Sequence, residues 1–137
     1  MKFLILLVIL TGSAMANVAD IRCNLNGPIV INGTWGAVRF NQAEIVINNL
    51  DKEVRSASMY IQDRFGSNYE NFFRLWQDRT RCSSNSTCIS TDFSSLRGLT
   101  VTMPNEVFEK DRFSFNTRVR SNSNRRTHFA NCRSTLR

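Results

Sequence analysis

The strongest constraint on the fold is a strict two-residue alternation near the C-terminus of the chain. Residues 112–120 read Arg-Phe-Ser-Phe-Asn-Thr-Arg-Val-Arg, so that Phe, Phe, Thr and Val occupy every second position. Successive side chains of a β-strand point to opposite faces of a sheet. The pattern therefore predicts a strand with one face packed on a core and the other in solvent.

Weaker forms of the same alternation recur along most of the chain. Strands are predicted at residues 29–31, 35–40, 43–47, 54–62, 99–103, 112–120 and 127–132. Clusters of Asn, Gly, Ser and Asp separate them, as is typical of turns between strands. The sequence therefore predicts a mostly β fold, an antiparallel sandwich or barrel of about seven to eight short strands.

One segment has a different period. Residues 67–70 read Ser-Asn-Tyr-Glu, which matches a helix capping box. The aromatic residues that follow the spacing of one helix face are Tyr69, Phe72, Phe73 and Trp76. This predicts one short helix near residues 68–77 and makes α+β the alternative fold class. The stretch could also form a strand, because aromatic residues favour sheets. Its aromatic stripe is expected to plug one end of the core, or else to lie exposed as a site for a protein partner.

The first residues have the three parts of a secretory signal. Lys2 is followed by an apolar run at residues 3–10 and by small residues at Ala14 and Ala16. The run is much shorter than the roughly 20 residues that span a bilayer, and no second long apolar run follows. We expect residues 1–16 to be removed as a signal peptide and residues 17–137 to form a single secreted, extracellular domain without a transmembrane segment.

Four cysteines indicate a disulfide framework. An even number in an exported chain of this size favours disulfides, and four cysteines allow three connectivities. We predict a local Cys82–Cys88 bridge and a long-range Cys23–Cys132 bridge. The six-residue spacing and the single histidine do not fit a zinc site, so no metal or other cofactor is expected.

Two triplets are acceptors for N-linked glycans. Asn32-Gly33-Thr34 and Asn85-Ser86-Thr87 both have the required spacing, and neither has proline in the middle. Both lie in polar stretches. We therefore predict glycosylation at Asn32 and Asn85.

Positive charge is concentrated at the C-terminal end. Residues 112–137 contain seven arginines and no acidic residue, whereas Lys, Arg, Asp and Glu nearly balance over residues 17–111. Guanidinium groups form bidentate bonds with sulfate, phosphate and carboxylate. The residues predicted to bind an anion are Arg112, Arg118, Arg120, Arg125, Arg126 and Arg133.

These observations favour a binding module over an enzyme. We expect a non-enzymatic protein that binds a sulfated glycan, an acidic lipid or a nucleic acid through its arginines. One alternative is an effector that contacts a protein or a membrane through the aromatic segment. A second is a small nuclease that uses His128 with arginines and one of four glutamates, Glu44, Glu70, Glu106 or Glu109. Hydrolase, metalloprotease and phosphate-loop motifs are absent from the sequence.

Overall fold

The structure is a computed structural model of the chain. It describes residues 18–33, 36–64, 69–72, 74–79, 82–92, 97–122 and 124–137. The predicted signal peptide at residues 1–16 lies outside the described residues. The described residues pack around one hydrophobic core cluster.

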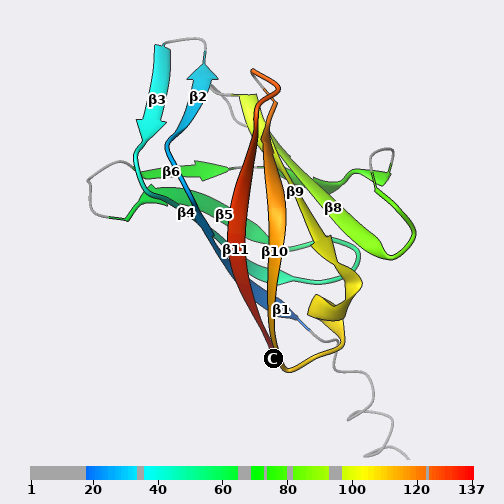
Figure 1. The fold of residues 1–137 in the computed structure, drawn as a ribbon. Helices are drawn as coiled ribbons and strands as arrows, with labels where there is room; N and C mark the ends of the chain where they lie inside the picture. Colours follow the sequence, from blue (N-terminus) through cyan, green and yellow to red (C-terminus); the bar gives the residue numbers. More distant parts are fainter. Residues whose placement is uncertain are drawn as a thin grey trace, which may run out of the picture.

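Nine strands form one antiparallel sheet (Figure 1). In their order across the sheet they are β6 (Tyr69–Phe72), β5 (Ser58–Asp63), β4 (Ala43–Leu50), β1 (Ala19–Leu25), β11 (Thr127–Leu136), β10 (Arg112–Ser121), β9 (Arg97–Pro104), β8 (Ser86–Asp92) and β7 (Arg74–Gln77). A separate hairpin pairs β2 (Ile29–Gly33) with β3 (Gly36–Phe40). The prediction of a mostly β, antiparallel fold is confirmed, with more strands than the seven or eight expected.

The two edges of the large sheet are formed by one continuous stretch of chain. Edge strands β6 and β7 are separated in sequence by residue 73 alone. Strand β6 pairs with β5, β7 pairs with β8, and β5 also contacts β7. The sheet therefore curls into a nearly closed barrel, an arrangement that leaves little free edge for pairing with another chain.

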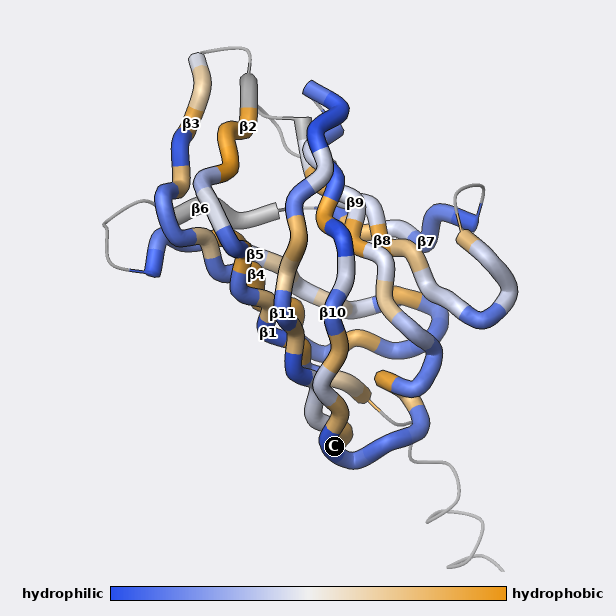
Figure 2. Tube along the Cα trace, in the orientation of Figure 1, coloured by the Kyte–Doolittle hydropathy of each residue, from blue (hydrophilic) through white to orange (hydrophobic). Residues whose placement is uncertain are grey.

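Alternating burial places the core on the inner face of the sheet. Along β1 the buried residues are Ala19, Ile21, Cys23 and Leu25, while Arg22 between them is exposed. The β2–β3 hairpin adds Ile29, Ile31 and Phe40 to the same core, and these side chains are fully buried. Figure 2 shows hydrophobic stretches on β2, β4 and β5, in contrast to the hydrophilic tip of the β10–β11 hairpin. A short 3-10 helix, η2 (Asn105–Phe108), contributes two further core residues, Val107 and Phe108.

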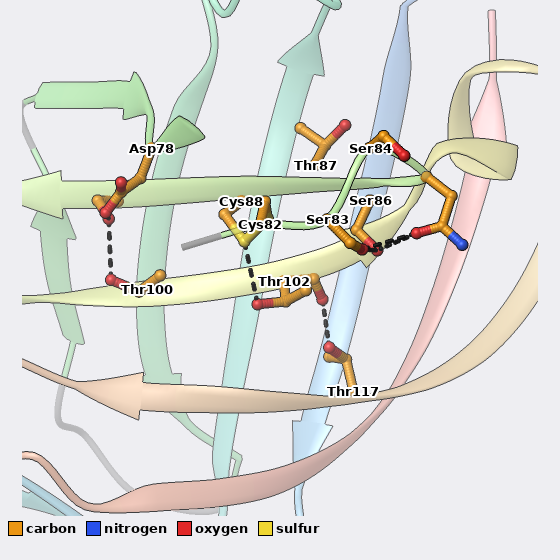
Figure 3. Close-up of a disulfide and its surroundings, with 12 residues drawn as sticks. Asp78, Cys82, Ser83, Ser84, Ser86, Thr87, Cys88, Thr100, Thr102 and Thr117 are labelled. Atoms are coloured by element: carbon orange, nitrogen blue, oxygen red, sulfur yellow. Dashed lines mark hydrogen bonds between the residues drawn. A yellow bond between two sulfur atoms is a disulfide. The ribbon is translucent and has the colours of Figure 1, made fainter. Parts of the chain in front are cut away.

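Both predicted disulfides are present. Cys23 and Cys132 lie directly opposite each other on β1 and β11, so this bridge joins two central strands of the sheet. Cys82 and Cys88 enclose the short polar loop that leads into β8 (Figure 3). These disulfides are compatible with an exported protein.

The predicted helix near residues 68–77 is wrong, and so is the α+β alternative. Residues 69–72 and 74–77 are strands, and residues 68 and 73 lie outside the described residues. Phe72 is paired with Met59 of β5, and Trp76 is paired with Ser90 of β8. Aromatic residues favour strands when a sheet edge is available. Here two edges provide long-range backbone hydrogen bonds, which outweigh the helical spacing of the aromatic side chains.

The bounds of several strands differ from those predicted. Strand β5 begins at Ser58 instead of residue 54, because Val54 has a left-handed φ of 55° in a turn closed by its N–H donating to the Asp51 carbonyl. Strand β11 continues to Leu136, beyond the predicted end at residue 132. Strands β1 and β8 were not predicted, although β1 alternates strictly between apolar and polar residues.

Candidate anion-binding surface

The β10–β11 hairpin is the scaffold of the surface. Its register runs without interruption from Arg112 opposite Thr135 to Arg120 opposite Thr127. Val119 of β10 and Ala130 of β11 face the core, and the residues next to them in each strand, such as Arg118 and Asn131, point outward. Arg112 and Arg118 are exposed on the outward face and Arg120 is half-buried there, as the alternation predicted.

We call the six predicted arginines the Arg face: Arg112, Arg118, Arg120, Arg125, Arg126 and Arg133. The hairpin gathers four of them near its tip, Arg118 and Arg120 on β10 and Arg125 and Arg126 in the turn. Arg112 lies at the other end of β10, about 26 Å from Arg120 at roughly 3.3 Å per residue. Arg133 of β11 lies opposite Ser114, also toward that end.

Backbone hydrogen bonds fix the conformation of the tip. The Ser121 N–H donates to the Arg126 carbonyl at 2.8 Å, and the Arg125 N–H donates to the Ser121 carbonyl at 2.9 Å. Arg125 has a left-handed φ of 60°. The Asn124 side chain accepts a bond from the Arg126 N–H at 3.0 Å and donates to the Val30 carbonyl at 3.3 Å. The tip is thereby attached to β2, and the backbone of Arg125 and Arg126 is held in a defined conformation.

An exposed aromatic ring supports one of the tip arginines. Phe129 lies directly opposite Arg118 in the hairpin and is 61% exposed. The guanidinium carbon of Arg118 lies 5.1 Å from the ring centroid, which is within the range of a cation–π contact. This contact positions Arg118 without neutralising its charge.

No arginine of the Arg face forms an ion pair with a carboxylate of the described residues. Other arginines among the described residues do form ion pairs with carboxylates. Arg22 pairs with Glu44 at 3.2 Å, and Arg137 pairs with Asp20 at 2.8 Å. Within the described residues, the charge of the Arg face is therefore not neutralised by direct ion pairs.

Sequence reasoning did not include Arg22 among the site residues. Arg22 of β1 lies directly opposite Arg133 of β11, so the positively charged surface extends onto a third strand. Two like charges in directly opposed positions destabilise a sheet. Glu44 on β4 offsets this repulsion, because Arg22 donates a hydrogen bond to its carboxylate. The signal that could have revealed Arg22 was the alternation of β1, which places it on the outward face.

An open hollow of about 760 Å³ lies beside the Arg face, on the outward side of β10, β11, β1 and β4. Its lining is mainly polar and includes Arg22, Arg133, Glu44 and four asparagines. The hollow combines positive charge with carboxylate and amide groups on adjacent strands.

The remaining predicted site residues lie elsewhere. His128 lies on the inward side of β11, opposite Val119, so the sheet separates it from the outward arginines. Burial, and to a lesser extent the charge of Arg126, lowers the pKa of His128 below its ordinary value of 6.5. The structure does not bring His128 together with Glu44, which is on the outward face of β4. The nuclease alternative with Glu70, Glu106 or Glu109 stays a prediction.

Of the aromatic segment, Tyr69 and Phe72 belong to β6, and Phe73 lies outside the described residues. Trp76 of β7 is 44% exposed. The predicted aromatic stripe is thus divided between two strands at opposite edges of the sheet order, and a protein partner at this place stays a prediction.

The two glycosylation triplets lie on different elements. Asn85 is exposed in the turn before β8, where its side-chain oxygen accepts a hydrogen bond from the Ser83 hydroxyl at 2.6 Å. Asn32 lies on β2 opposite Ala37, and Thr34 of its triplet is outside the described residues. Occupancy at both sites stays a prediction.

Comparisons with protein-family models, with curated proteins and with solved structures find no significant match to this chain. Within the described ranges, no helix is long and apolar enough to cross a bilayer. In the same residues, no group of three His, Cys, Asp or Glu side chains is arranged to hold a metal ion.

Proposed function

We propose that this chain is a secreted, non-enzymatic binding module whose Arg face holds an anionic ligand. The observation that carries the proposal is the gathering of six arginines on one hairpin with no carboxylate partner among the described residues. The four tip arginines repel one another, and the fold gains no stability from the repulsion. A bound anion removes that cost and replaces it with charge-assisted hydrogen bonds.

The shape of the hairpin supports an extended ligand. The arginines are spread along β10 and β11 and around the tip instead of converging on one point. A single small anion would contact only two or three of them. A polymer with repeated negative charges could contact the tip cluster and Arg133 together, which gives the binding its steep dependence on salt.

Retention of the oxidised, mature protein on a heparin column tests the proposal. The test variant carries Arg118→Ser, Arg120→Ser, Arg125→Ser and Arg126→Ser. A matched control carries Arg39→Ser, Arg55→Ser, Arg74→Ser and Arg79→Ser, which removes the same charge from exposed positions outside the hairpin.

We expect the wild type to elute well above physiological salt, the control close to it, and the test variant much earlier. The salt dependence of the test variant should also be shallower, by roughly one unit of log–log slope for each arginine that no longer neutralises an anionic group. Equal shifts in the two variants would mean that retention reflects net charge alone. Elution of the wild type at low salt would contradict the proposal directly.

A further inference from the structure

A row of asparagines crosses the hollow beside the Arg face. Asn116 of β10 lies directly opposite Asn131 of β11, which in turn lies directly opposite Asn24 of β1. Glu44 of β4 is the next residue along this row, opposite Asn24. All four line the hollow. The antiparallel register thus places three amides and one carboxylate side by side across four strands.

Among the described residues, nothing uses the hydrogen-bonding capacity of these amides. The side chains of Asn24, Asn116 and Asn131 form no hydrogen bond with any described residue. The side-chain oxygen of Asn24 is also buried away from the surface without a partner, which is unfavourable unless a ligand or water satisfies it. By contrast, Glu44 accepts bonds from Arg22 at 3.2 Å and from Gln62 at 3.1 Å.

The unused groups match hydroxyl chemistry. Each asparagine offers one acceptor oxygen and two N–H donors, and a hydroxyl group also both donates and accepts. Phosphate and sulfate oxygens only accept, so they would use the amide nitrogens and be repelled by the amide oxygens. The carboxylates of Asp20 and Glu44 in the same hollow would repel a uniformly anionic chain. A ligand that alternates hydroxyl and anionic groups fits this lining best.

We propose that the hollow is a saccharide-binding site, and that the ligand is an acidic glycan carrying carboxylate or sulfate groups. The asparagine row binds its hydroxyl groups, Arg133 pairs with an anionic substituent, and the tip arginines bind the continuing chain. This inference rests on the proposed function, because Arg133 and the tip belong to the Arg face. It ranks nucleic acid and lipid head groups below an acidic glycan, because a glycan presents several hydroxyl groups for each anionic group along its chain.

The test compares a glycan with a nucleic acid on the same protein variants. The probes are a fluorescent heparan sulfate octasaccharide and an oligothymidylate of equal charge, and affinity is measured by anisotropy at one fixed salt concentration. The amide variant carries Asn116→Ala and Asn131→Ala, both at exposed positions. Its control carries Asn41→Ala and Gln42→Ala, exposed amides of the β3–β4 turn outside the hollow. The tip variant with four arginines changed to serine is measured beside them.

We expect the amide variant to bind the octasaccharide about tenfold more weakly, because it loses two or more net hydrogen bonds. Its affinity for oligothymidylate should stay within about twofold of the wild type, and the control should match the wild type with both probes. Unchanged thermal unfolding of the amide variant shows that its fold is intact.

Several outcomes would overturn the inference. Equal losses for both probes, or no loss for either, would show that the amide row does not recognise a saccharide. Tighter binding of the wild type to oligothymidylate than to the octasaccharide would assign the surface to nucleic acid and leave the proposed function standing. If the tip variant binds both probes as the wild type does, the proposed function itself fails.

Discussion

The two disulfides should differ greatly in what they contribute to stability. The Cys23–Cys132 bridge closes a loop with a sequence separation of 109, and the Cys82–Cys88 bridge closes one of 6. In the chain-entropy description, a disulfide stabilises the fold by restricting the unfolded chain, and its contribution rises with the logarithm of loop length. This gives about 4.8 kcal/mol for the long loop and about 2.3 kcal/mol for the short one.

The variants for this test are Cys23→Ala with Cys132→Ala, and Cys82→Ala with Cys88→Ala. The difference of about 2.5 kcal/mol corresponds to roughly 10 °C in Tm for a domain of this size. Cys23 and Cys132 are also both buried on the core side of the sheet, so shortening them adds a packing loss of the same sign. The long-range variant should therefore unfold at the lower temperature.

Thermal unfolding followed by circular dichroism in the absence of reductant measures both values. The wild type, treated identically, sets the reference, and reduced wild type should fall below both variants. If the local variant loses as much stability as the long-range variant, or more, then loop length does not control the contribution of these bridges and the reasoning is refuted.

Three further predictions concern the core and the hairpin. Gly98→Ala should lower the free energy of unfolding by about 3 kcal/mol, because a Cβ there would lie well inside contact distance of the carbonyl oxygen and hydroxyl of Thr91. Urea unfolding measures this loss. A loss of less than about 1 kcal/mol would contradict the close approach of β8 and β9. Ile45→Ala should cost roughly 2–5 kcal/mol, because this side chain is fully buried in β4, and an unchanged urea midpoint would mean that the site is not in the core. The lowered pKa of His128 means that, as pH falls below 6.5, the unfolded chain takes up a proton that the folded protein does not bind until lower pH. The stability associated with neutral His128 is therefore present above pH 6.5 and lost on acidification. His128→Gln should flatten this part of the plot of unfolding free energy against pH. Identical plots for the two proteins would refute the prediction.

The fold class and the Cys82–Cys88 disulfide could be predicted from the sequence because they depend on local signals. Alternation at residues 112–120 is visible without knowledge of any neighbour, and a short Cys82–Cys88 spacing leaves Cys23 and Cys132 to pair. The aromatic segment could not be assigned in this way. Its residues match both a helix face and a strand, and only the two available sheet edges at β5 and β8 decide between them.

The Arg face was partly predictable, and the hollow was not. A run of arginines without acidic residues can be read directly from residues 112–137. The asparagine row joins Asn24 to Asn131, and their positions in the sequence give no sign that they meet. Register between β1 and β11 is a property of the whole fold, set by which faces are buried. A surface that combines distant strands therefore becomes visible only once the sheet is assembled.

The central pairing of β1 with β11 has a consequence for how the protein is made. During synthesis the chain emerges from its N-terminal end, so β1 and β4 are available long before β11. The middle of the sheet stays open until then, and Cys23 meets Cys82 and Cys88 before its native partner exists. Contacts between residues so far apart in sequence form slowly. We therefore expect the protein to mature more efficiently where disulfides can be reshuffled and an incomplete barrel is kept from associating with its neighbours.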